Sequence, residues 1–240
     1  MNFLVAHTNG ILYKHLVGAL TSYPIPEIEL PTADGERLLD VGCSWGRWCI
    51  AAARKGYRPV GLDPSLGAVL AARRVAESMG LQIQWIVADA RYLPFADDVF
   101  DVVYSYSVFQ HFGREDLVTA CGEAARVLKE QGFVQMQLAN KYGLRSLYHQ
   151  ARRRFRTPRA FEVRYRSPAE MKELFPEPFY AVEIKPDCYF GLGLQKADSA
   201  LMPIWKRCVL FASELLKKVA PFCLPLRLAA DSLFVIASRK

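Results

Sequence analysis

Residues 38–48 read Leu-Leu-Asp-Val-Gly-Cys-Ser-Trp-Gly-Arg-Trp, and this stretch decides the fold of the chain. It begins as an apolar run, continues through a turn built on Gly42, Ser44 and Gly46, and then becomes helix-like. Glycine and serine let the backbone approach a ligand without a large side chain in the way. The following helix directs unpaired N–H groups and a partial positive charge at the turn. The stretch therefore predicts a strand, a small-molecule site of the nucleotide-cofactor kind, and a helix.

Apolar runs alternate with helical patterns along the chain. The runs predict strands near residues 37–42, 58–63, 83–88, 99–105 and 132–139. The segments between them predict helices near residues 46–55, 65–79, 114–129 and 143–150. Continuous apolar runs suit strands buried on both faces, and this alternation is typical of a doubly wound parallel sheet.

The pattern changes towards the end of the chain. Residues 161–165 alternate like a small strand, and residues 167–170 form a capping box with proline at the first helical position. A strand near 179–185, a helix near 200–219 and a last strand near 231–238 follow. We expect an α/β, Rossmann-like, doubly wound seven-stranded sheet. It should be mostly parallel, with an antiparallel C-terminal edge strand and helices on both faces.

The length of 240 residues fits one domain, which we divide into four segments. Residues 1–36 hold a helix near 9–20 and a proline-containing linker, and residues 37–140 form the cofactor-binding core. Residues from about 140 to 200 form a lid and acceptor region. A closing helix and the edge strand occupy residues 200–240.

Almost all of the net charge of +7 comes from one segment, because residues 152–166 hold seven arginines against one acid, Glu162. A nucleic-acid binder more often carries basic residues on several elements, so nucleic acid is not an expected partner. Three interpretations of the arginine segment stay open. The segment could be a solvated loop, or a binding site for phosphate or carboxylate on a substrate. Together with the helix near 200–219, it could also contact an anionic membrane.

The cysteines and the first 20 residues argue against several classes of protein. The six cysteines form no C-x-x-C pair and do not cluster with the four histidines, so neither a disulfide framework nor a metal site is expected. Polar residues interrupt every apolar run within residues 1–20, so neither a signal peptide nor a membrane span is expected. We expect a cytoplasmic protein, or one that is peripheral at the inner membrane surface.

Three aspartates fall at predicted strand ends, where ligands bind in an open parallel sheet. Asp40 lies in the first strand, Asp63 closes the second, and Asp89 follows the third. An acid about 20 residues beyond a glycine turn is placed to accept hydrogen bonds from two ribose hydroxyls, and Asp63 lies 21 residues after Gly42. A helix cap is the alternative role for Asp63, because Pro64 and a serine follow it.

With these residues the chain resembles the class I S-adenosylmethionine-dependent methyltransferases, in the branch that includes the ubiquinone and menaquinone biosynthesis enzymes. The resemblance covers about residues 35–140 and is carried by residues 38–48, 61–65, 88–101 and 125–132. A hydride-transferring Rossmann enzyme needs G-x-G-x-x-G, and Arg47 stands where the third glycine belongs. Ser44 departs from the family, which often has a second glycine there.

The resemblance implies roles for individual residues. The turn would carry the methionine part of S-adenosylmethionine, with Asp40 holding the loop and the amino group. Asp63 would bind the ribose, and Asp89 would accept from the adenine amino group. The end of the fourth strand would form the floor facing the methyl group. The residues assigned to the cofactor are Asp40, Gly42, Cys43, Ser44, Gly46, Asp63, Pro64, Asp89, Ala90 and Ser105.

Methyl transfer from a sulfonium requires alignment with the acceptor, exclusion of water and, for some acceptors, removal of a proton. His111 and Tyr106 are the candidate bases, and His111 is nearest to the expected methyl position. Ordering of the loop is the alternative role for His111. Tyr142 and His149 are further candidates.

Residues 105–108 lack the prolines of enzymes that methylate base amines, and no Pro-Cys pair for cytosine carbon methylation lies near them. The resemblance therefore favours a small-molecule or lipid-linked acceptor, methylated at oxygen. The alternatives are C-methylation of a quinone-type ring and a non-catalytic methyltransferase-fold partner or RNA-binding module.

Overall fold

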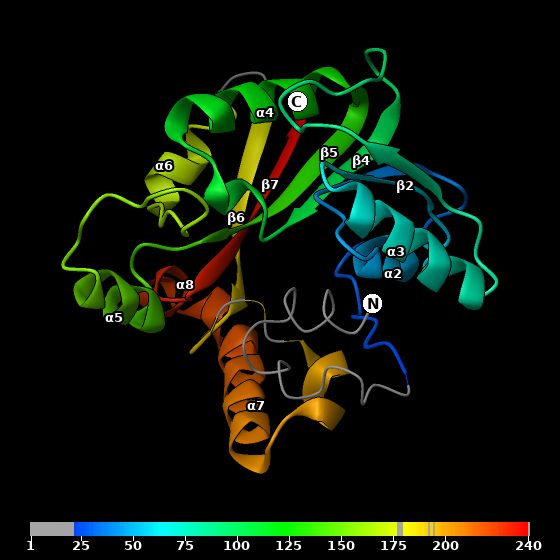
Figure 1. Ribbon diagram of the computed structural model, residues 1–240. Coiled ribbons are helices and arrows are strands. Elements are labelled where there is room, and N and C mark those ends of the chain that lie inside the picture. The colour runs from blue at the N-terminus through cyan, green and yellow to red at the C-terminus, as the bar shows by residue number, and fades with distance from the viewer. Residues whose placement is uncertain (1–21, 177–179, 192, 194, 240) are drawn as a thin grey trace.

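The computed structural model describes residues 22–176, 180–191, 193 and 195–239 (Figure 1). Over these residues the chain forms a seven-stranded sheet in the order β3-β2-β1-β4-β5-β7-β6. Its strands are β1 Arg37–Val41, β2 Arg58–Asp63, β3 Gln84–Val87, β4 Phe100–Tyr106, β5 Leu128–Ala139, β6 Tyr180–Cys188 and β7 Ser232–Arg239. The first five strands are parallel, and β7 is antiparallel to both β5 and β6.

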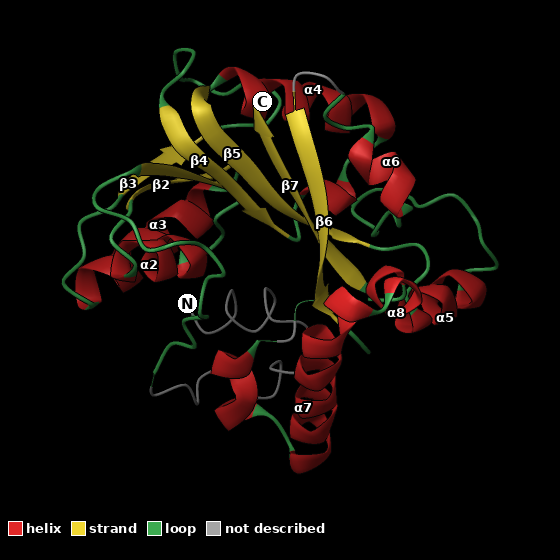
Figure 2. Ribbon diagram, turned by 180° about the vertical axis from the view of Figure 1, so that it is seen from behind, coloured by secondary structure: helices red, strands yellow, loops and turns green. Residues whose placement is uncertain are grey.

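Helices cover both faces of the sheet, with α2 and α3 on one side and α4 and α6 on the other (Figures 1 and 2). The helices are α2 Arg47–Arg54, α3 Leu66–Ser78, α4 Arg114–Arg126, α5 Leu144–Arg152, α6 Pro168–Lys172, α7 Ile204–Val219 and α8 Leu224–Leu228. The predicted Rossmann-like α/β fold is confirmed. The helix expected near residues 9–20 lies outside the described residues.

The side-chain alternation of β1 explains how the layers meet. Leu39 and Val41 join the cluster that α4 covers, whereas Leu38 packs against Trp48 of α2. Because successive side chains of a strand point to opposite faces, Asp40 shares the α2 face with Leu38. The pattern of β1 thus places a carboxyl group beneath the helix that follows the glycine turn.

Three local expectations need correction. The antiparallel C-terminal strand is not at the edge, because β7 lies between β5 and β6 and β6 forms the edge. Residues 161–165 do not form a strand: Arg164 N donates to Gln110 O, and Arg166 makes an isolated bridge with Asn140. The helix expected to reach residue 129 ends at Arg126, since Leu128 begins β5.

The capping box at the start of α6 is confirmed. The side chain of Ser167 accepts from Glu170 N, and the Glu170 carboxylate accepts from Ser167 N. The helix expected near 200–219 begins at Ile204, because residues 196–201 form a separate 3-10 helix.

The glycine turn between β1 and α2 permits no side chain at two positions. Gly42 has φ 79°, and a Cβ there would lie 2.2 Å from Cγ2 of Val108. Gly46 has φ 83°, and a Cβ there would lie 2.5 Å from the ring of Trp85. Both glycines therefore combine a left-handed conformation with a close approach from another element.

Gly42→Ala should lower the free energy of unfolding by roughly 2–5 kcal/mol, since it adds a clash to the cost of a positive φ. Gly80→Ala is the matched control, because Gly80 has φ 71° and nothing within 4 Å of an added Cβ. Gly80→Ala should lower the free energy of unfolding only by the cost of a positive φ, about 1–2 kcal/mol. Urea unfolding of both variants measures the difference, and equal losses would contradict the close approach of Val108.

Candidate cofactor and acceptor site

The turn is fixed to the second strand by backbone hydrogen bonds. Gly42 N and Cys43 N both donate to Leu62 O, at 2.7 and 2.9 Å. Ser44 has φ 48°, a conformation that favours glycine. Its N–H donates to Asp63 Oδ2 at 2.9 Å. The structure therefore brings the predicted turn and the predicted ribose acid side by side.

Asp63 is partly exposed at the end of β2. Its Oδ1 accepts from Ser65 N at 2.9 Å, but the N-cap of α3 is Ser65, whose side chain accepts from Ala68 N. Asp63 thus holds a turn and is not itself the helix cap. A carboxylate offers about four acceptor positions, so both oxygens keep capacity for ligand hydroxyls. Pro64, beside it, is exposed.

Asp40 lies beneath the turn and is 1% exposed. The thiol of Cys49 donates to its Oδ2 at 3.3 Å, whereas Oδ1 is buried with no hydrogen-bond partner. Burial raises the pKa of Asp40 to about 7, and the charge of Asp63 adds to the rise while Cys49 and Arg47 oppose it. A buried carboxyl oxygen without a partner is costly, and a ligand donor would satisfy it.

Arg47, the first residue of α2, is buried beside this carboxyl group. Its guanidinium carbon lies 5.3 Å from the centre of the Trp48 ring and 5.8 Å from that of Tyr106. Trp48 is itself buried against Tyr104 and Tyr106, so it packs within the core. Arg47 stands where the dinucleotide-binding pattern has its third glycine, so a buried positive charge replaces that glycine.

Asp89 has a partner that sequence reasoning missed. Its carboxylate pairs with Arg91 at 2.6 Å, and Arg91 also reaches Asp116 at 2.9 Å. Hydrogen bonds from Arg91 lower the pKa of Asp89. Ala90, the next residue, is buried. The adenine contacts of Asp89 and Ala90 stay predictions.

The end of β4 forms a buried polar floor. Ser105 Oγ donates to Val41 O at 2.9 Å, which ties β4 to the end of β1. The Tyr106 hydroxyl donates to Asp187 Oδ2 at 2.8 Å and accepts from Gln195 Nε2 at 2.8 Å. Ser232 Oγ also donates to Asp187 Oδ2, at 2.7 Å. Asp187 and Gln195 come from the C-terminal part of the chain, where no motif marked them.

Burial raises the pKa of Tyr106 and that of Asp187. The tyrosine proton is already directed at a carboxylate. This geometry suits a residue that positions the floor of the site. Its role as a base stays a prediction.

His111 belongs to the 3-10 helix Phe109–His111, just past β4. Its Nδ1 lies 2.8 Å from Phe161 O, and the two rings stack with centroids 4.2 Å apart. A carbonyl only accepts, so this contact assigns the ring proton to Nδ1 and leaves Nε2 as the basic nitrogen of neutral imidazole. Burial, and secondarily the charge of Arg164, lower the pKa of His111 against the opposite effect of the Phe161 and Ser107 carbonyls.

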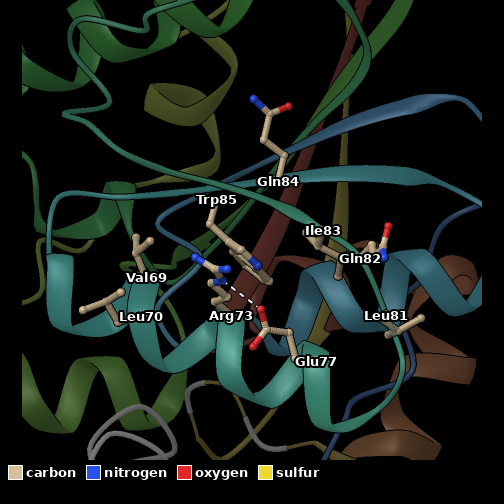
Figure 3. A pocket seen from close by; sticks show the side chains of 9 residues that line it. All are labelled: Val69, Leu70, Arg73, Glu77, Leu81, Gln82, Ile83, Gln84 and Trp85. Atoms are coloured by element: carbon tan, nitrogen blue, oxygen red, sulfur yellow. Dashed lines mark hydrogen bonds and ion pairs between the residues drawn. The ribbon is translucent and has the colours of Figure 1, made fainter.

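The other candidate bases lie elsewhere. His149 lines a hollow with four arginines, and Tyr142 is exposed. A second hollow, of about 600 Å³, lies between α3 and the start of β3 (Figure 3). No predicted site residue lines it, although its Trp85 also touches Gly46. Among the described residues, no cluster of three or more His, Cys, Asp or Glu side chains could hold a metal ion.

Asp40→Asn should alter the pH dependence of stability. Asp40 binds its proton more tightly in the folded chain than at the ordinary value of 3.8. The contribution of the Asp40 proton to the free energy of unfolding is therefore full below pH 3.8 and is lost as the pH rises through about 7. Asparagine stays neutral at every pH. Between pH 4 and pH 8 the free energy of unfolding of the variant should therefore rise relative to that of the wild type by a few kcal/mol, on the order of 3. Urea unfolding at both pH values tests this; a pH-independent difference would contradict it.

Comparison with known proteins finds relatives over the same part of the chain. The family described as "Methyltransferase domain" matches residues 38–132. The ubiquinone biosynthesis O-methyltransferase of Brucella anthropi is 33% identical over 115 residues, which are 46% of this chain and 46% of that protein. The match thus spans less than half of that relative.

Solved structures share the fold. A SAM-dependent methyltransferase from Methanosarcina mazei superposes with TM-score 0.61 at 17% identity, covering 86% of this chain and 93% of that one. The magnesium protoporphyrin IX methyltransferase of Synechocystis PCC 6803, solved with bound SAH, gives TM-score 0.59 at 15% identity, covering 88% and 76%. Residues 38–132 are thus similar to a methyltransferase domain, and the chain shares the fold of these solved methyltransferases over most of its length.

Proposed function

We propose that this protein transfers the methyl group of S-adenosylmethionine to an oxygen atom of a small or lipid-linked acceptor. The observation that carries the proposal is the buried Oδ1 of Asp40, which has no hydrogen-bond partner. It lies at a turn whose two glycines pack closely against Val108 and Trp85. When bound, the cofactor supplies an electrophilic methyl group on a sulfonium.

The residues present suit this cofactor. The backbone of Gly42–Gly46 would hold its methionine part, and the free Oδ1 of Asp40 would accept from its amino group. Asp63, fixed by Ser44 N and Ser65 N, would accept from the ribose hydroxyls. The chain's part in the reaction is to hold these groups rigidly and to keep water from the reacting atoms.

Proton removal from an acceptor hydroxyl falls to His111 in this proposal. A lowered pKa keeps imidazole neutral at physiological pH, and a neutral ring is the form that accepts a proton. Its Nδ1 contact with Phe161 orients the ring. Loop ordering and base catalysis are therefore compatible roles of one side chain. Transfer to oxygen is also the activity in the name of the Brucella anthropi relative.

Asp63→Ala should weaken S-adenosylmethionine binding by about 1–3 kcal/mol, the scale of a lost charged acceptor. Asp34→Ala is the control, because Asp34 is exposed and precedes β1, at the opposite end from the turn. Isothermal titration of both variants measures the loss. An Asp63 variant that binds as tightly as the control would remove this residue from the ribose role.

His111→Gln should reduce turnover by about 10²–10⁴-fold and leave cofactor affinity unchanged. In the wild type, activity should fall only below pH 6.5, because the pKa of His111 is lowered from that value. The acid limb should be missing from the residual activity of the variant. S-adenosylhomocysteine release across a pH series, with an acceptor found by screening lipid and metabolite extracts, provides the measurement.

An acid limb that persists in His111→Gln would assign the proton transfer to another group. The position of the new methyl group, read by NMR of the product, separates the two chemistries. An O–CH₃ signal supports the proposal, and a C–CH₃ signal establishes carbon methylation in its place.

A further inference from the structure

Helix α5 is amphipathic in the reverse sense. Leu144 and Tyr148 are 64% and 60% exposed, whereas its buried residue is Ser146. Positions 144, 148 and 151 share one side of the helix. Phe155, just beyond the helix, is 70% exposed as well. Surface helices of globular proteins normally turn their apolar side to the core, so this outward side lacks its usual cover among the described residues.

The orientation of α5 is fixed by its buried side. Ser146 N donates to Asp231 Oδ1 at 2.9 Å, and Ser146 Oγ donates to Asp231 O at 3.3 Å. A Cβ on Gly143 would lie 2.4 Å from Asp231. Figures 1 and 2 both show α5 next to α8. The apolar side chains therefore face outward on a firmly anchored helix.

Positive charge surrounds these apolar side chains. His149 and four arginines, at 152, 153, 154 and 156, line a hollow of about 510 Å³. Residues 144–166 contain one acid, Glu162, which pairs with Arg156 at 2.7 Å. Burial, and after it the charges of Arg145, Arg153 and Arg152, lower the pKa of His149, whereas the charge of Asp231 raises it.

We infer that α5 and the arginines after it form a docking surface for an anionic lipid bilayer. We name it the α5 surface and define it by Leu144, Arg145, Tyr148, Arg152, Arg154 and Phe155. Guanidinium groups match lipid phosphates, and exposed leucine and aromatic side chains enter the boundary between headgroups and acyl chains. A free phosphate would use the arginines alone, and RNA would use the arginines together with the aromatic rings but would have no use for the exposed Leu144. A bilayer uses both features, and each arginine near its surface contributes measurably to binding.

The surface is also linked to the reaction site through the chain. Beyond the arginines, Phe161 stacks on His111, and Arg164 N donates to Gln110 O. A lipid-linked acceptor held at the bilayer would thus meet the protein beside the candidate base. The docking inference itself does not depend on which acceptor is methylated.

The test is cosedimentation of the full chain with vesicles of phosphatidylglycerol and phosphatidylcholine, and with vesicles of phosphatidylcholine alone. The wild type should bind the anionic vesicles, and binding should weaken as salt rises. Arg152→Glu with Arg154→Glu should lower the apparent affinity at least about tenfold. Arg74→Glu with Lys172→Glu is the control of equal charge change on exposed residues of α3 and α6, and should keep most of the binding.

The apolar part has its own pair of variants. Tyr148→Ser with Phe155→Ser should weaken vesicle binding about tenfold or more, because each substitution removes apolar side-chain area that would be buried in the bilayer. Tyr92→Ser, at a tyrosine that is 72% exposed on another segment, should not. Unchanged cofactor titration and thermal unfolding confirm that each variant is folded.

Three results would overturn the inference. They are equal binding to neutral and anionic vesicles, an equal loss in the charge control, and a loss in Phe211→Ser on α7 but none in the α5 variants. Tighter retention of an RNA oligonucleotide than of anionic vesicles would assign the arginines to nucleic acid.

Discussion

The close contact between the turn after β1 and its neighbours governs the rest of this structure. Gly42 lies against Val108 from the end of β4, and two amides of the turn share the carbonyl of Leu62 in β2. These contacts lock three strand ends together. They also bury the carboxyl group of Asp40, which leaves one oxygen without a partner. The buried oxygen that could accept from a ligand donor thus lies where these strands are joined.

The same constraint separates two ends of the site. On the β2 side, the Asp63 carboxylate accepts from the Ser44 and Ser65 amides and remains partly exposed. On the β4 side, Tyr106 is enclosed by Asp187 and Gln195, and His111 is oriented by Phe161. The first end uses residues that are close in sequence. The second end depends on the chain returning over the sheet.

This difference explains how far sequence reasoning could reach. The strand–turn–helix unit and the place of Asp63 beside the turn were predictable, because the spacing of the glycines and the acid along the chain determines where they lie. Three features could not be predicted: the place of β7 between β5 and β6, the Arg91 partner of Asp89, and the contacts of Asp187. They depend on contacts between residues far apart in the sequence or on the direction of a side chain. Residues 161–165 do not form the expected strand, because Arg164 N donates to Gln110 O in the 3-10 helix after β4 and no strand of the described part of the chain pairs with this segment.

A crystal structure of the protein with S-adenosylmethionine is the most direct test of this account. The methionine part of the cofactor should lie along Gly42–Gly46, with a donor on Asp40 Oδ1 and the ribose on Asp63. Density for the cofactor in another place, such as the hollow between α3 and β3, with the turn unoccupied, would contradict it.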